Sequence, residues 1–390
     1  MTDRYPAAQP GARQEPAREA PPAPEEPADS AGVVTTPLLS APIRTEILPP
    51  PALPGTQVAA ERPSGPHIAL IVPTASPALG SVAESFKQGF ATAAAFDGKE
   101  APRYRIYAAA NESDSLTANF RTALDNGATL IVGGLTRDGA SLMARLAQQL
   151  EGTGIPVLAL NAPEGPAAEH FYFVTLSLDN EARQVAELAA GEGARRIAVI
   201  HTNAALARRV DDVFEKEWAR VGGEVAGRVA FSGDPVEAAG LRARVESLRP
   251  DAVFLVADPA AARFARPYVP AGIPVYGTSL GFEPRADAMA NVDLDGVRFV
   301  EMPWFVQPDH PAVMVYKRPD AQTSVEQERL YALGLDAWRI AGLIANPGQR
   351  SPMLDGVTGR LTLDAGHQFA RQLTPVELRD GHVQAYSKAQ

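Results

Sequence analysis

The sequence RLYALGLDAWRIAGLIANPGQRSPMLDGVTGRLTL, residues 329–363, contains the features that decide the fold. Its first half is apolar on nearly every side of a helix, interrupted by Asp336 and Arg339. A helix of this kind is buried in a large core, and this one is too short and too charged to span a bilayer. The Asn-Pro-Gly sequence at 346–348 predicts its end, because proline cannot continue a helix. Residues 355–364 then predict a glycine-bent turn and a short strand. We therefore expect the rest of the chain to fold around this helix.

Composition excludes several classes of protein. The chain has 390 residues, 45% of them hydrophobic, which predicts two to three domains with a sizeable core. A net charge of −10 disfavours nucleic acid and anionic membrane as partners. The absence of cysteine excludes disulfides, thiolate zinc sites and a cysteine nucleophile. No apolar run approaches the length of a transmembrane segment, so we expect none.

Residues 1–66 differ in composition from the remainder. They contain 15 of the 35 prolines and a single aromatic residue, Tyr5. Such a segment cannot bury enough apolar surface to offset its ordering entropy. We expect a disordered, Pro-rich tether with polyproline character.

From His67 onward, apolar strand patterns alternate with amphipathic helix patterns. The continuous run from Ile68 to Val72 predicts a strand buried on both faces. Further strands are predicted at 104–109, 129–132, 157–160, 171–176, 197–200, 225–231, 252–256, 275–276 and 297–300. Helices are predicted at 80–96, 115–126, 138–150, 180–190, 206–218, 236–248 and 260–268.

This alternation predicts an α/β fold, because strands joined by helices form parallel sheets through right-handed crossovers. It occurs in two rounds, which indicates two doubly wound, Rossmann-like lobes. We assign residues 67–175 and 297–353 to lobe 1. Residues 176–296 and 354–390 form lobe 2, to which we expect the closing strand to belong.

Polar residues follow several of the predicted strands, where open α/β sheets bind their ligands. A Gly-Gly-Leu-Thr sequence at 133–136 precedes a helix, so its backbone amides could hold a carboxylate. The same residue types are also ordinary turn and capping residues. The candidates for a ligand-binding cleft are Thr74, Ser76, Gly133, Gly134, Thr136, Asn161, Thr202, Asn203, Thr278 and Ser279.

Catalytic and metal-binding motifs are weak. Residues 277–281 match G-x-S-x-G, in which Ser279 would be the nucleophile of a serine hydrolase. The context is wrong, because Phe282-Glu283-Pro284 interrupts the expected helix and about nine strands precede the serine. The six histidines are scattered and none pairs with a carboxylate at helical spacing, which disfavours a metal site. We expect no catalytic residue and no cofactor.

Three stretches resemble a known family. Residues 67–390 resemble a type I periplasmic binding protein, the fold of branched-chain amino acid receptors. More narrowly, residues 171–184 (FYFVTLSLDNEARQ), 329–340 (RLYALGLDAWRI) and 355–364 (DGVTGRLTLD) resemble the LppC/LpoA lipoproteins, which are penicillin-binding protein activators.

The resemblance implies a non-enzymatic periplasmic regulator of peptidoglycan synthesis. Family members are anchored to the outer membrane by a lipidated cysteine and dock on a bifunctional peptidoglycan synthase, a penicillin-binding protein, which they stimulate. This sequence departs from them in lacking the cysteine, a signal peptide and the large N-terminal helical-repeat domain. We therefore expect the anchor to be encoded upstream of Met1, if the start has been assigned too late.

Two alternatives remain open. The first is a receptor whose interlobe cleft closes on an amino acid or a similar small molecule, and the second is the serine hydrolase. In a receptor, Thr74, Ser76, Thr136 and Thr202 should face an open, solvated cavity. In a docking protein that cleft is expected to be closed or plugged.

Overall fold

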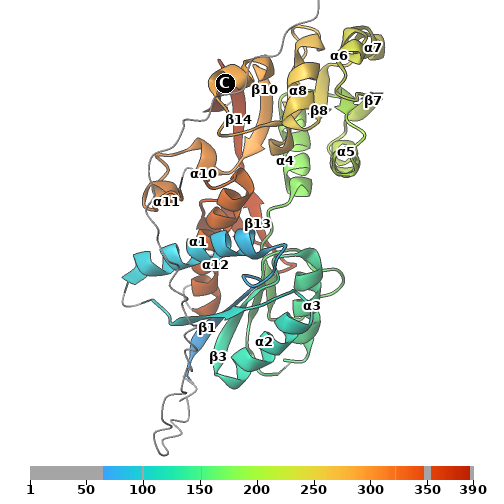
Figure 1. Cartoon of the computed structure of the whole chain (residues 1–390). Helices are drawn as coiled ribbons and strands as arrows, with labels where there is room; N and C mark the ends of the chain where they lie inside the picture. The colour runs from blue at the N-terminus through green and yellow to red at the C-terminus, as the bar shows by residue number, and fades with distance from the viewer. Residues whose placement is uncertain (1–64, 99–100, 151, 321, 347–352, 387–390) are drawn as a thin grey trace, which may run out of the picture. The chain divides into compact units, whose positions relative to one another are not determined.

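The protein is described by a computed structural model that covers residues 65–98, 101–150, 152–320, 322–346 and 353–386. The predicted tether, residues 1–66, lies outside the described residues except for Gly65 and Pro66. Figure 1 shows sheets with helices packed around them, and most strand pairs of the two larger sheets are parallel, so the α/β prediction is confirmed.

The first sheet has five parallel strands in the order β2-β1-β3-β4-β5. Their bounds are β1 (His67–Val72), β2 (Tyr104–Ala108), β3 (Ala128–Gly133), β4 (Val157–Ala159) and β5 (Phe171–Phe173). Every residue of β1 is buried, as its continuous apolar run predicts.

The second sheet has seven strands in the order β15-β14-β10-β9-β8-β6-β7. Its strands are β6 (Arg196–His201), β7 (Glu224–Ala230), β8 (Ala252–Val256), β9 (Val275–Gly277), β10 (Val297–Glu301), β14 (Thr374–Arg379) and β15 (His382–Ala385). The pairs β10·β14 and β14·β15 are antiparallel, and the other pairs are parallel.

The helices connect the strands or cover the sheets (Figure 1). They are α1 (Gly80–Asp97), α2 (Asp114–Asp125), α3 (Arg137–Gln148), α4 (Leu178–Gly191), α5 (Ala205–Arg220), α6 (Pro235–Ala239), α7 (Leu241–Leu248), α8 (Pro259–Ala265), α9 (Ala288–Asn291), α10 (Pro303–Val306), α11 (Pro311–Met314) and α12 (Val325–Ala345). Short 3₁₀ turns lie at η2 (Arg266–Tyr268), η3 (Ser279–Gly281) and η4 (Val292–Leu294). The helix predicted over 236–248 is divided into α6 and α7 at Gly240, because glycine has a poor helix propensity and destabilises the helix there.

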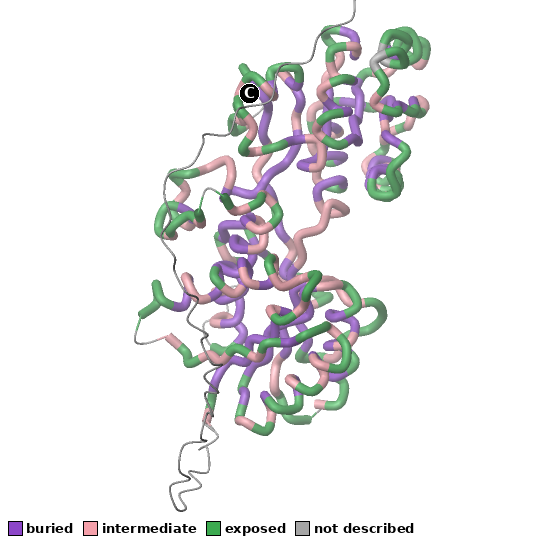
Figure 2. The backbone as a smooth tube through the Cα atoms, viewed as in Figure 1, coloured by how far each residue is buried: buried purple, intermediate pink, exposed green. Residues whose placement is uncertain are grey.

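Helix α12 is the buried helix that the sequence predicts. Ser324 and Gln327 form a capping box at its start, and the helix ends at Ala345, one residue before Asn346. Pro347 and Gly348 lie outside the described residues. Figure 2 shows α12 largely buried, with Trp338 only 2% exposed.

Helix α12 packs against α1 by close approach of the two backbones. A Cβ on Gly334 would lie 2.7 Å from the Phe90 backbone nitrogen, so only glycine fits there without a shift. Gly89 of α1 faces the Tyr331 carbonyl in the same way. Two glycines, one on each helix, therefore set the distance between α1 and α12.

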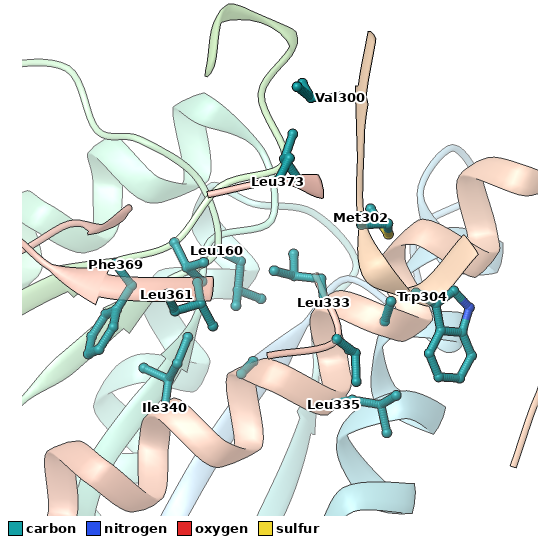
Figure 3. Packing of buried hydrophobic residues seen from close by; sticks show 14 of the residues in the cluster. Leu160, Val300, Met302, Trp304, Leu333, Leu335, Ile340, Leu361, Phe369 and Leu373 are labelled. Carbon is teal, nitrogen blue, oxygen red and sulfur yellow. The ribbon is translucent and has the colours of Figure 1, made fainter. Parts of the chain in front are cut away.

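The C-terminal residues form more strands than the sequence analysis predicts. Strands β11 (Met353–Asp355), β12 (Arg360–Leu363) and β13 (Phe369–Gln372) make a separate antiparallel sheet, so the strand at 360–363 does not join the second sheet as expected. That role falls to β14, which pairs with β10, and to β15, which pairs with β14. Figure 3 shows Leu361 and Phe369 of the small sheet gathered with Leu333, Leu335 and Ile340 of α12 in one cluster.

The residue boundaries of the two lobes remain a prediction. Strand β10, within the 297–353 segment assigned to lobe 1, pairs in parallel with β9 in the second sheet. Residues 303–346 then supply α12, which packs on α1 beside the first sheet. The crossing back to lobe 1 accordingly follows β10 rather than preceding it.

Candidate functional site

The backbone amides that follow β3 hold a carboxylate, and this carboxylate comes from the chain itself. Glu112 Oε1 accepts a hydrogen bond from Leu135 N, and Glu112 Oε2 accepts one from Thr136 N, both at 2.6 Å. The Thr136 hydroxyl accepts a bond from Gly139 N and caps α3. The amides that the sequence analysis proposes for a ligand carboxylate at the start of this helix therefore bind the side chain of Glu112.

The other lobe 1 candidates have local structural partners. Gly133 and Gly134 are buried, and a Cβ on Gly134 would lie 2.9 Å from the Ala140 backbone nitrogen. Ser76 Oγ accepts a hydrogen bond from Leu79 N beside the start of α1, and Asn161 Nδ2 donates to the Leu135 carbonyl at 3.1 Å. Thr74 lies half-buried in the loop between β1 and α1. Capping and loop packing account for these contacts.

The four lobe 2 candidates are dispersed. Thr202 is buried and Asn203 is exposed after β6. Thr278 is buried against a small apolar cavity, and its hydroxyl has no hydrogen-bond partner among the described residues. Among the ten candidates, Ser279 is the one that lines a larger cavity, formed by several elements of the described residues.

That cavity, here called the hinge cavity, has a volume of about 670 Å³. It lies between the start of α4, the loop 279–285, the start of α12 and β13. Its apolar lining comes mainly from Leu176, Leu178, Leu280, Phe282, Met302 and Val325, and its charged lining includes Glu181, Glu326, Arg329 and Arg371.

Glu181 is the acidic group of the hinge cavity, although it is only 6% exposed. Its Oε2 accepts a hydrogen bond from Ser279 N at 2.9 Å and its Oε1 accepts one from the Ser279 hydroxyl at 3.0 Å. Burial raises the pKa of Glu181, although nearby Arg329 and the two bonds from Ser279 oppose that rise. Glu181 therefore fixes the Ser279 hydroxyl as a donor.

Arg329 and Glu301 form a buried ion pair behind the same wall. The guanidinium is bidentate to the carboxylate, with Nη1–Oε1 at 2.8 Å and Nη2–Oε2 at 2.6 Å. Glu301 is only 1% exposed, so Arg329 neutralises a charge that would otherwise be costly to bury.

Arg371 is the fourth charged group; it lies on β13 and is 5% exposed. Its Nε donates to the Thr175 carbonyl at 2.8 Å and its Nη1 donates to the Thr358 carbonyl at 2.9 Å. No carboxylate among the described residues pairs with it directly. Burial lowers the pKa of Arg371 to about 10, a shift that Glu181 only partly offsets.

Asp336 supports this wall from α12 and is fully buried. Its carboxylate accepts hydrogen bonds from Val357 N at 3.0 Å, Thr358 N at 2.8 Å and the Thr358 hydroxyl at 2.7 Å. Asp336 therefore fixes the turn before β12. It thereby also positions the Thr358 carbonyl, which accepts a hydrogen bond from Arg371.

Glu181, Glu301, Arg329 and Arg371 were not predicted as site residues, although the sequence contains a recognisable pattern around two of them. Phe369, Arg371 and Leu373 occupy every second position and are all buried, so the arginine shares the inward face with two apolar residues. Glu181 lies four residues before Val185 on a buried helical stripe. A charged residue on an apolar face is the signal that could have found both.

No cluster of three or more His, Asp or Glu side chains within the described ranges is arranged to hold a metal ion. None of the helices in those ranges combines the length and apolarity that a bilayer crossing demands.

Comparison with known proteins gives a family match over most of the chain. The family model described as "LppC putative lipoprotein" matches residues 56–381. A relative from Enterobacter sp. (strain 638), named penicillin-binding protein activator LpoA, is 25% identical over 303 residues, which cover 66% of this chain and 41% of the relative. The relative of the same name from Escherichia coli (strain K12) is 24% identical over 306 residues, covering 66% of this chain and 44% of its own length. The chain thus spans less than half the length of these relatives.

Solved structures share the fold. The Haemophilus influenzae LpoA C-domain, described as a regulator of PBP1A, has a TM-score of 0.69 at 22% identity, over 82% of this chain and 100% of that domain. A Chromobacterium violaceum structure, described as a "putative branched-chain amino acid ABC transporter", has a TM-score of 0.68 at 34% identity, over 80% of this chain and 100% of that one. The predicted type I periplasmic-binding-protein-like fold is thereby confirmed.

Proposed function

This chain belongs to the LppC family of lipoproteins, and we propose that it is a non-enzymatic regulator of peptidoglycan synthesis that docks on a bifunctional synthase and stimulates it. The observation that carries the proposal is the family match over residues 56–381. Relatives in that family are named penicillin-binding protein activators, and one structural neighbour is described as a regulator of PBP1A. The proposed partner is accordingly a penicillin-binding protein of the PBP1A type.

The arrangement around Ser279 supports a non-enzymatic role. The Ser279 hydroxyl donates to the carboxylate of Glu181, and no histidine lines the hinge cavity in the described residues. A serine nucleophile needs a general base that accepts its proton and is itself oriented by a third group. Ser279 also opens a three-residue 3₁₀ turn rather than the helix of a nucleophile elbow. We expect no labelling of Ser279 by a fluorophosphonate probe.

A receptor for an amino-acid-like ligand is the second candidate. The 34% identity to the Chromobacterium violaceum structure favours it, because that protein is described as a "putative branched-chain amino acid ABC transporter". Against it stands Glu112, whose carboxylate takes the amides of Leu135 and Thr136, where a ligand carboxylate was expected. We therefore rank the regulator first.

We further propose that the protein acts in the periplasm while anchored to the outer membrane by a lipid. The family description as a lipoprotein supports this location, and a Pro-rich segment at 1–66 suits a spacer. If the proposal is right, codons upstream of Met1 should continue in frame. They should encode a signal peptide that ends in a cysteine.

The docking proposal can be tested by affinity capture. The full chain is immobilised and incubated with detergent-solubilised envelope extract, and retained proteins are identified by mass spectrometry. A bifunctional synthase should be enriched over a control column that carries an unrelated protein of similar charge. Enrichment of small-molecule transporter subunits without a synthase would favour the receptor instead.

A further inference from the structure

Arg371 holds unused hydrogen-bonding capacity at the wall of the hinge cavity. A guanidinium carries five N–H donors. Two of those of Arg371 donate hydrogen bonds to the Thr175 and Thr358 carbonyls. The remaining three have no acceptor among the described residues, although the side chain is 95% buried. These are one donor on Nη1 and both donors on Nη2, so the two terminal nitrogens can together bind a carboxylate end-on.

A second feature of the cavity also favours an anion. The start of the 21-residue helix α12 lines it at Ser324, Val325 and Glu326. Gln327 N is taken by the Ser324 hydroxyl, whereas the Val325 and Glu326 amides donate to no acceptor in the described residues. The first amides of a helix carry its positive pole.

The buried charges around the cavity limit how negative the ligand can be. Glu181 and Glu301 balance Arg329 and Arg371, so this group of four is formally neutral. A dianion such as phosphate would place two further charges beside two carboxylates, whereas a carboxylate adds one. Leu178, Leu280, Phe282, Met302 and Val325 supply apolar surface for the rest of a ligand.

We propose that the hinge cavity binds a small organic carboxylate with an apolar body, whose anionic group is held by Arg371. A volume of about 670 Å³ suits such a molecule. The site differs from the amide site occupied by Glu112, and it uses only Ser279 of the residues predicted from strand ends. The inference is independent of docking on a synthase.

Calorimetry on the full chain tests the proposal without any synthase, so its failure is separate from failure of the regulatory function. The probes are acetate, benzoate and 4-methylpentanoate, each paired with its neutral amide, and inorganic phosphate. We expect benzoate or 4-methylpentanoate to bind, with the matching amide weaker by about tenfold or more because it lacks the charge-assisted pair. Acetate should bind more weakly because it lacks the apolar body. Absence of saturable binding by all three acids, equal binding of acid and amide, or preference for phosphate would each overturn the proposal.

Two variants locate the binding to this cavity. Arg371→Gln should weaken the acid by about tenfold or more while leaving the amide unchanged. Because Arg371 also holds two backbone carbonyls, Val325→Trp provides a second test that fills the cavity and leaves the arginine in place. Arg242→Gln, an exposed arginine on α7, is the matched control and should bind as wild type does. Wild-type affinity in Val325→Trp would contradict the assignment.

Discussion

Replacing Gly334 by alanine should destabilise the protein, although alanine is the better helix former. Helix propensity alone favours alanine by about 1 kcal/mol at an interior position. At Gly334, however, the new methyl would enter the backbone of α1, 2.7 Å from Phe90 N and closer still to the Phe86 carbonyl. Overpacking of a core costs about 1–3 kcal/mol, and occasionally more. The upper part of that range applies, because backbone atoms cannot rotate away as a side chain does.

We therefore expect Gly334→Ala to lose about 2 kcal/mol of unfolding free energy after the propensity gain is subtracted. Gly342, eight residues further along the same helix, is the matched control, since a Cβ there meets nothing within 4 Å. Gly342→Ala should gain about 0.5–1 kcal/mol. The assay is equilibrium urea unfolding followed by tryptophan fluorescence, which reports on Trp338 in α12 together with Trp218 and Trp304.

A double variant sharpens the same test. Gly89→Ala disturbs the interface from the opposite side, against the Tyr331 carbonyl. Once one methyl has separated the helices, the second should cost less, so the two losses should be less than additive. If Gly334→Ala were as stable as wild type, or gained as much as Gly342→Ala, the close approach of α1 and α12 would be wrong.

Three further perturbations test the site and the core. Trp338→Ala should cost on the order of 3–5 kcal/mol in urea unfolding, because it removes a buried ring that packs on Phe90 and Tyr104 and donates to Asp97; a loss under about 1 kcal/mol would put the helix on the surface. Glu112→Ala should lose about 1–3 kcal/mol through its two amide bonds, whereas the exposed Asp138→Ala in the first turn of α3 should lose less than about 1 kcal/mol; equal losses would mean that the amide site is not held by Glu112. Burial raises the pKa of Glu181, so the folded state binds more protons than the unfolded state above about pH 4.3. The stabilisation that Glu181 contributes is complete below its unfolded-state pKa and is lost as the pH rises through its folded-state pKa. The loss of unfolding free energy caused by Glu181→Gln should therefore shrink as the pH rises between these two pKa values. A loss that grows with pH would refute the raised pKa of Glu181.

The sequence predicted those parts of the fold that depend on local burial. The apolar run before Pro73 and the helical stripe of α5 carry their pattern within one element, and both lie where expected. Strands β14 and β15 escaped prediction because they are polar on one face. Strand β14 is defined by its pairing with β10, which lies more than 70 residues earlier in the chain, and β15 by its pairing with β14. The interruption at Gly240 follows from propensity, but an amphipathic pattern on both sides concealed it.

The candidate site could be predicted only at its strand ends. The sequence shows which polar residues follow a strand, but not which of them face a common cavity, since that depends on how distant loops meet. Glu112 illustrates the difficulty, because its contact with Thr136 joins loops 24 residues apart. Arg371 is positioned at the cavity by its hydrogen bond to the Thr175 carbonyl, which lies 196 residues away in sequence. No local pattern encodes either contact.

Peptidoglycan synthesis in vitro tests the central claim most directly. A purified bifunctional synthase of the PBP1A type, from the same organism, is supplied with lipid-linked precursor, and glycan polymerisation and peptide cross-linking are followed with and without the full chain. We expect saturable stimulation of the synthase and no product from the chain alone, with Ser279→Ala as effective as wild type. A folded chain that neither binds the synthase nor changes its rate would contradict the claim.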